Sequence, residues 1–200
     1  MTLRIPGRQL TFSQFMQQLP DQEGRYELVN GNIHPILPTR YQINIADFIA
    51  RKFDKEVERW KLNYRVSGRI MIRTFTTTGR EQSRQPDISV VDQTKWTQHP
   101  YAYAALLEPI QLAVEVINNL QDDYIHKYNE YQRLGIPEYW LVDPLGLVQH
   151  HLDRPKIPQV FVNLLDNNGI YQSQTYHGKE PIISETFPQL KLSVEQILQA

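Results

Sequence analysis

The sequence predicts a mixed α/β fold, in which a mixed β-sheet is flanked by helices and extended by additional β-hairpins. One long amphipathic helix is expected over residues 41–60, where apolar residues recur at helical spacing. Two short apolar runs, 86–91 and 110–117, have the length and composition of strands. The second run is followed by a helical pattern and then by another strand-like segment, which is the order that α/β proteins use.

The N-terminal part predicts a short helix and a hairpin. Thr11 followed by Gln14 forms a capping box, in which each side chain can satisfy a backbone N–H at the start of a helix. Residues 25–29 and 33–37 then read as two strands joined by an Asn-Gly turn. We expect this hairpin to belong to the sheet.

The segment after the long helix predicts one strand over residues 64–75, because its side chains alternate. Its apolar side carries Val66, Ile70 and Ile72, and its other side carries Arg65, Arg69 and Arg73. An arginine row on one strand face can contact phosphates. It can equally be a solvated face paired with carboxylates elsewhere, and the sequence favours this second interpretation slightly.

The central part predicts a strand–helix–strand unit. Residues 110–117 are continuously apolar, as in a central strand covered on both faces. A helix is expected over 121–134, ended by Gly135, because glycine readily adopts the left-handed conformation that follows a helix. Residues 138–142 form the next strand.

The C-terminal part predicts further strands and a last helix. Residues 147–152 continue as a strand, and 160–165 and 170–174 flank a turn to form a hairpin. Ser193 opens the final short helix. No stretch has the composition of a linker, so we expect one domain over residues 1–200.

The composition excludes several kinds of chemistry. The 200 residues contain no cysteine, which excludes disulfides, thiolate catalysis and Cys-ligated zinc or iron–sulfur sites. No apolar run approaches the ~20 residues that span a bilayer, and the first ten residues lack the apolar core of a signal peptide. We therefore expect a cytoplasmic protein. The net charge of −1 argues against binding nucleic acid by bulk charge.

Two acidic residues interrupt the apolar strands, and they are the main candidates for chemistry. Asp87 begins one strand and Glu115 lies near the end of the next. A carboxylate in an apolar setting is costly unless it is paired or binds a cation. Mg²⁺ is typically held by one or two carboxylates together with waters and substrate phosphates. Asp87 and Glu115 therefore predict a Mg²⁺ or Mn²⁺ site, if sheet pairing brings them together.

Lys127 is the third candidate, on the helix that follows the Glu115 strand. It falls on the flank of the apolar stripe of that helix, so its ammonium can reach toward the strand ends. There it would orient an attacking water or stabilise a phosphorane. The alternative is a solvated salt bridge with Asp123, one helical turn away.

Several motifs together resemble the Uma-two family of proposed restriction endonucleases, over roughly residues 11–190. They are YELVNG at 26–31, Pro86-Asp87, EVIN at 115–118, the spacing of Asp123, Lys127 and Tyr131, and GIPEYWLVDP at 135–144. The resemblance implies the restriction-endonuclease-like fold of the PD-(D/E)XK superfamily and divalent-metal hydrolysis of phosphodiesters. DNA is the substrate that it favours, and a homodimer is the expected assembly.

The resemblance also assigns residues. It carries the family aspartate and glutamate over to Asp87 and Glu115. The superfamily lysine stands two residues after the glutamate, where this chain has Ile117; in the family it has moved to the following helix, and Lys127 matches that position. Glu27 matches a further family acid, which either completes the site or forms a strand-to-strand ion pair.

The chain departs from the family at some positions. Asn32 stands where the family often has a second acid, and Tyr41 where it often has a histidine. Three functions therefore remain open. The chain is a metal-dependent endonuclease, or a binding or regulatory module that kept the fold without its chemistry, or an interaction protein whose carboxylates and Lys127 form a buried ion-pair network.

Overall fold

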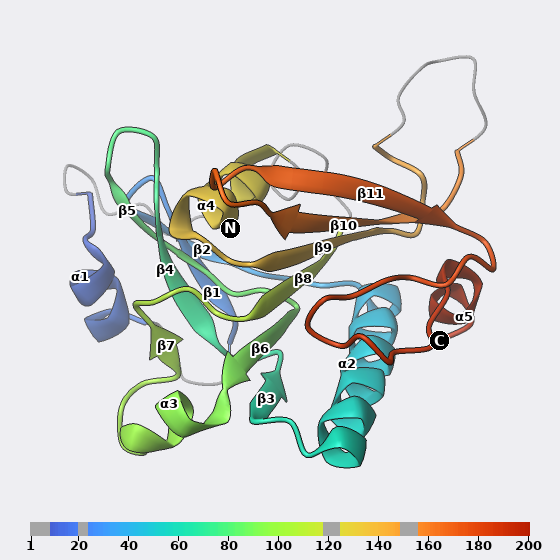
Figure 1. Ribbon diagram of the computed structural model, residues 1–200. Helices are drawn as coiled ribbons and strands as arrows, with labels where there is room; N and C mark the ends of the chain where they lie inside the picture. The colour runs from blue at the N-terminus through green and yellow to red at the C-terminus, as the bar shows by residue number, and fades with distance from the viewer. Residues whose placement is uncertain (1–8, 20–23, 118–124, 149–155) are drawn as a thin grey trace.

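A computed structural model describes the fold over residues 9–19, 24–117, 125–148 and 156–200 (Figure 1). Within these residues the helices are α1 (Phe12–Gln17), α2 (Arg40–Trp60), α3 (Gln93–Gln98), α4 (Tyr128–Leu134) and α5 (Val194–Leu198). One sheet has the order β2 (Asn32–Pro35), β1 (Tyr26–Val29), β5 (Glu81–Arg84), β4 (Met71–Phe75) and β7 (Ala105–Leu106). The other has the order β11 (Tyr171–His177), β10 (Gln159–Leu165), β9 (Glu138–Asp143), β8 (Leu112–Val116), β6 (Ile88–Asp92) and β3 (Tyr64–Ser67).

Both sheets are mixed, which confirms the predicted fold class. In the six-stranded sheet β8 runs parallel to β9, with α4 on the connection between them, and the other neighbours are antiparallel. In the five-stranded sheet only the short β7 pairs in parallel, with β4. The predicted hairpins at the N-terminus and near the C-terminus correspond to β1–β2 and β10–β11.

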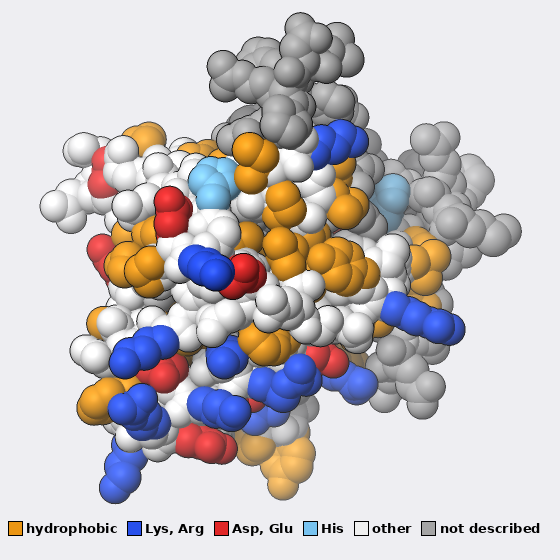
Figure 2. All heavy atoms as spheres, turned by 90° about the vertical axis from the view of Figure 1, so that its right-hand side faces the viewer, with side chains coloured by type: hydrophobic (Ala, Val, Ile, Leu, Met, Phe, Trp, Pro, Cys, Tyr) orange, Lys and Arg blue, Asp and Glu red, His pale blue; other side chains and the backbone are white. Residues whose placement is uncertain are grey.

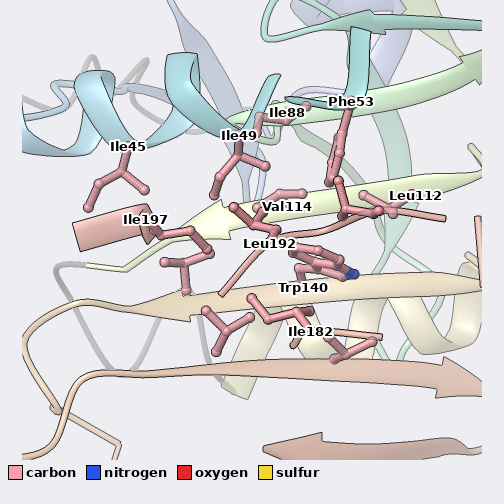
Figure 3. Close-up of a cluster of buried hydrophobic side chains, with 14 of the residues drawn as sticks. Ile45, Ile49, Phe53, Ile88, Leu112, Val114, Trp140, Ile182, Leu192 and Ile197 are labelled. Carbon is pink, nitrogen blue, oxygen red and sulfur yellow. The ribbon is translucent and has the colours of Figure 1, made fainter. Parts of the chain in front are cut away.

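The long helix α2 covers one face of the six-stranded sheet. Its buried stripe of Ile45, Ile49 and Phe53 packs on strand residues such as Val114 and Trp140 (Figure 3). The C-terminal helix α5 adds to the same cluster beside α2. The capping box of Thr39 and Gln42 begins α2 at this core. The predicted helix over 41–60 is therefore confirmed, one residue longer at its start.

Helix α4 lies between the two sheets. Tyr131 is fully buried in the cluster on the other face of the six-stranded sheet, together with Tyr139 and Leu141 of β9. Glu130, one residue earlier, accepts a hydrogen bond from Thr74 of β4 in the five-stranded sheet at 2.6 Å. The helix ends at Gly135, whose φ is 85°, as expected for a left-handed residue after a helix. α4 therefore contacts both sheets at once.

The single strand predicted over 64–75 is wrong. The structure divides it into β3 and β4, which belong to different sheets. The chain bends at Gly68, between the two strands, and the backbone there passes close to that of Asp87. A Cβ atom at position 68 would lie 2.7 Å from the backbone oxygen of Asp87, which explains the need for glycine. The alternation of apolar residues continues across the break because Ile70 and Ile72 pack in the second cluster.

Two other boundaries differ from the prediction. A π-helical turn over residues 125–127 precedes α4, and residues 121–124 of the predicted helix lie outside the described residues. Of the strand predicted at 147–152, residues 147 and 148 are not in a strand and 149–152 lie outside the described residues. The strands β5 and β7 and helix α3 were not predicted.

The outer surface on the α2 and α5 side carries charges of both signs. Figure 2 shows Lys and Arg side chains gathered with Asp and Glu among them on the lower part of this face, and hydrophobic side chains above. This face is therefore not a purely basic surface. In the described part of the chain, no helix combines the length and the apolar character needed to cross a membrane.

Candidate active site

Asp87 and Glu115 meet across two adjacent strands. β6 and β8 are antiparallel, with Ile88 opposite Val114, so one further step of the same register brings Asp87 opposite Glu115. Directly opposed residues of an antiparallel pair point to the same face. The carboxylate of Asp87 also accepts the backbone N–H of Val116 at 2.9 Å. The predicted meeting of the two acids is therefore what the geometry shows.

Lys127 reaches the same place from the turn that precedes α4. Its ammonium nitrogen lies 3.0 Å from Oε2 of Glu115 and 3.2 Å from Oε1 of Glu27. Its side chain is only 8% exposed. The solvated helix face proposed as an alternative is thus wrong, because Lys127 is buried between two glutamates. Asp123, the partner in that alternative, lies outside the described residues.

Arg84 of β5 extends this ion pairing into the interior. Its Nη1 lies 3.0 Å from Oε2 of Glu27. Its Nε and Nη2 donate to the two oxygens of Glu130 at 2.8 and 2.6 Å, a bidentate arrangement. Gln82 and Thr74 also donate to Glu130, at 2.7 and 2.6 Å. This fully hydrogen-bonded network attaches α4 to the five-stranded sheet and fixes Glu27 beside Lys127.

Asp87 has a cationic partner of its own. Nη1 of Arg25 donates to Oδ1 of Asp87 at 3.2 Å, and its Nη2 donates to the carbonyl oxygens of Gln85 and Pro86 at 3.1 and 3.3 Å. The side chains of Arg25 and Asp87 are 23% and 11% exposed, so this pair lies at the edge of the site. In these ion pairs four carboxylates (Glu27, Asp87, Glu115, Glu130) face three cations, which leaves one negative charge in excess.

Two neutral side chains fix the end of β8. The hydroxyl of Tyr131 donates to Oε1 of Glu115 at 2.6 Å. Burial, and then the adjacent carboxylate of Glu115, raise the pKa of Tyr131 well above its usual value, so it stays a donor. Gln42 of α2 donates to the carbonyl oxygen of Val116 at 2.7 Å. The position of Glu115 is thus set from α4, and its strand is held from α2.

The surrounding charges keep Glu27 and Arg84 ionised. Burial alone would raise the pKa of Glu27, but Lys127 and Arg84, with the backbone N–H of Gln85, lower it to about 2. Burial would also lower the pKa of Arg84, yet its bonds to Glu130 and the charge of Glu27 raise it well above its ordinary value. Glu27 and Arg84 therefore remain charged at neutral pH.

A cavity of about 270 Å³ opens onto these groups. Its lining includes Asp87, Glu115, Lys127 and Glu27, and the side chain of Asp87 is 11% exposed whereas that of Glu115 is 3% exposed. The β1–β2 hairpin supplies another wall, which includes His34. Asn32 and Tyr41, where the chain departs from the family pattern, do not appear in this lining. These two positions therefore lie outside the cavity, and a third departure, Asn118 where the family often has serine, lies outside the described residues.

The donor set suits a hard divalent cation. Among the described residues no cluster of three or more His, Cys, Asp or Glu side chains has the arrangement of a metal site. Asp87 and Glu115 supply carboxylate oxygens at the cavity, and Mg²⁺ needs only one or two such carboxylates when waters and phosphates complete its shell. The residues present thus fit Mg²⁺ or Mn²⁺ bound together with a phosphate substrate.

Sequence reasoning found the residues that meet at the cavity but missed their partners. Arg25 and Glu130 carried no separate signal, and Arg84 was considered only as a continuation of the arginine row after Arg73. The arginine row is not one row: Arg65 lies over the ring of Trp96, while Arg73 pairs with Glu81 in the other sheet. The interpretation that those arginines pair or stack locally fits these contacts better than a continuous phosphate-binding stripe.

Comparisons with known proteins agree with this fold. A solved structure from Anabaena variabilis ATCC 29413, described as "a putative nuclease belonging to DUF820", is 18% identical and aligns with a TM-score of 0.71. The alignment covers 95% of this chain and 98% of that chain. At such low identity the likeness bears on the fold alone. A search of curated proteins gave no match. A family model described as "Putative restriction endonuclease" matches residues 12–195, nearly the whole chain, and the chain therefore belongs to the Uma2 family.

Proposed function

We propose that this protein is a divalent-metal-dependent endonuclease that hydrolyses phosphodiester bonds, with DNA as its substrate. The observation that carries the proposal is the convergence of Asp87, Glu115 and Lys127 on one open cavity. Asp87 lies 28 residues before Glu115 and Lys127 lies 12 residues after it, so strand pairing and the turn before α4 bring them together. Membership of the family supports a nuclease.

Asp87 and Glu115 would hold Mg²⁺ or Mn²⁺. When bound, such a cation lowers the pKa of a water ligand and neutralises charge that develops on the phosphate. The two carboxylates that would bind the cation, those of Asp87 and Glu115, lie on the same face of the six-stranded sheet. Tyr131 keeps one oxygen of Glu115 in a fixed direction through its 2.6 Å hydrogen bond, which limits the rotation of that carboxylate.

Lys127 would act on the water or on the phosphate. In the reaction a water oxygen adds to phosphorus, one P–O ester bond breaks, and the released oxygen takes up a proton. An ammonium is a compact donor of three N–H groups, so it can orient the water and stabilise the added negative charge. Glu115 and Glu27 hold this ammonium at 3.0 and 3.2 Å, which sets its position before substrate arrives.

The proposed substrate and assembly rest on the family resemblance and on the modest size of the chain. A net charge of −1 predicts that DNA binding depends on local groups at the cavity rather than on bulk attraction. We also propose a homodimer, which sedimentation of the purified protein tests directly.

One observation favours a second candidate, an interaction protein whose ion pairs are purely structural. Lys127 and Arg25 both have carboxylate partners in the structure, so the network satisfies itself without a ligand. The cavity beside these groups favours the nuclease, because a purely structural network needs no space for a ligand.

Cleavage of supercoiled and linear DNA in the presence of Mn²⁺ distinguishes the two functions. We expect the parent protein to cut and Lys127→Ala to lose at least about a hundredfold in rate, as typical for loss of a group that acts in the transition state. The matched control is Lys179→Ala, which removes an exposed lysine paired with Glu195 and should cut like the parent. Equal cutting by Lys127→Ala would refute the assignment, and no cutting by a folded, Mn²⁺-loaded parent would favour the structural network.

A further inference from the structure

Arg25 occupies the oxygen of Asp87 that a cation would need. Its Nη1 donates to Oδ1, whereas Oδ2 accepts the N–H of Val116. A divalent ion on Asp87 would stand within a few ångströms of the guanidinium, and two positive centres on one carboxylate repel each other. Arg25 and a divalent cation therefore compete for the same group.

The contacts of the Arg25 side chain indicate that it can be released from Asp87. Its side chain is 23% exposed, in contrast to Arg84, which is 2% exposed and bidentate to Glu130. The other partners of Arg25 are backbone carbonyls of Gln85 and Pro86, which water can satisfy at the edge of the site. Its Nε is buried without a hydrogen-bond partner in the described structure, so the bound position is incompletely satisfied.

We propose that Arg25 is an exchangeable counter-ion: it neutralises Asp87 in the metal-free protein and is displaced when a divalent cation binds. This inference rests on the proposed metal site, and it concerns how that site is filled. Displacement leaves a partly exposed guanidinium with free N–H donors beside Asp87, at the edge of the site. Such a group is suited to bidentate contact with a phosphodiester, so the exchange makes metal binding and substrate binding favour each other.

The consequence is that removing Arg25 tightens metal binding and weakens substrate binding. We expect Arg25→Gln to bind Mn²⁺ about fivefold more tightly than the parent, because the competing ion pair is partly exposed and of modest strength. Arg25→Lys keeps a weaker competitor and should lie between the two. Arg51→Gln, which removes an exposed arginine of α2 outside the described ion pairs and the cavity lining, is the matched control and should bind like the parent.

The experiment is calorimetric titration of Mn²⁺ into the full chain without DNA, with thermal unfolding in EDTA to confirm that each variant is folded. Binding of a short DNA duplex in Ca²⁺ is measured on the same proteins, with weaker binding expected for Arg25→Gln. Equal or weaker Mn²⁺ affinity in a folded Arg25→Gln overturns the exchange and leaves the metal site intact. Failure of every protein to bind Mn²⁺, Arg25→Gln included, overturns the metal site itself.

Discussion

Arg84 and Glu130 face each other through two hydrogen bonds, Nε to Oε2 at 2.8 Å and Nη2 to Oε1 at 2.6 Å, inside the protein. The pair joins β5 to α4, and Arg84 also contacts Glu27 beside Lys127. Its side chain is 2% exposed, so the whole guanidinium is held by protein groups. The pair thus determines where α4, and with it Lys127, stands over the strand ends.

Removing Arg84 should destabilise the fold strongly. Arg84→Met leaves the carboxylates of Glu27 and Glu130 buried without this counter-ion, and such a loss costs about 3–5 kcal/mol. Urea unfolding at neutral pH measures the free energy. Arg73→Met is the control, because its pair with Glu81 is 29% and 30% exposed and should contribute under ~1 kcal/mol. Similar losses in both variants would contradict the structural role of Arg84.

Stability should fall in acid because of Glu27. The folded carboxyl has a pKa of about 2 against an ordinary 4.5, so the unfolded chain binds more protons between these values. The stabilisation is fully present above about pH 4.5 and is lost as pH falls toward 2, by roughly 3 kcal/mol. Unfolding in urea at a series of pH values measures it. In Glu27→Gln the free energy of unfolding should change less with pH between these two values. If it changed as steeply as in the parent, Glu27 would not be the cause of the acid sensitivity.

Gln42 should contribute more to the stability of the fold than Gln14, which occupies the same capping position in α1. Both Gln42 and Gln14 close capping boxes, but Gln42 also donates to the carbonyl oxygen of Val116. Gln42→Ala leaves that acceptor without this donor, so we expect a loss of about 2 kcal/mol. Gln14→Ala removes an exposed cap and should cost about 0.5 kcal/mol. Denaturant unfolding compares the two, and equal losses would show that the bond to β8 contributes nothing.

A divalent cation should stabilise the parent through Glu115. Binding only to the folded state adds about 2.7 kcal/mol when the free ion exceeds its Kd a hundredfold. Thermal unfolding with and without Mn²⁺ detects this as a rise of several degrees. Glu115→Gln keeps the shape of the side chain but should lose most of the rise. A variant that gains as much as the parent would exclude Glu115 as a ligand.

The sequence predicted the elements with regular apolar patterns and the acids that interrupt them. Asp87 and Glu115 stood out because each is a charge in an apolar strand, and their opposition follows from the pairing of β6 with β8. Strand β5 was missed because its residues, Glu81–Arg84, are all polar, although Gln82, Ser83 and Arg84 are buried. When buried polar residues form hydrogen bonds with each other, the sequence shows no alternation of apolar residues from which a strand could be predicted.

The partner of Lys127 was not predictable from the helix alone. Helical spacing proposes local partners one turn away, such as Asp123, whereas the actual partners come from β8 and β1. The same limit explains the division of residues 64–75. Alternation shows which side chains face the interior, but it does not show that the partly buried Val66 and the buried Ile72 pack in different clusters.

The position of α4 between the sheets has a mechanical consequence. Glu115 belongs to the six-stranded sheet and Glu27 to the five-stranded sheet, and the ammonium of Lys127 contacts both. Any ligand that draws this ammonium away from one glutamate therefore removes a bond between the two halves of the protein. Contacts made by this lysine and cohesion between the two sheets are therefore coupled, although Arg84 and Glu130 hold α4 to the five-stranded sheet without it.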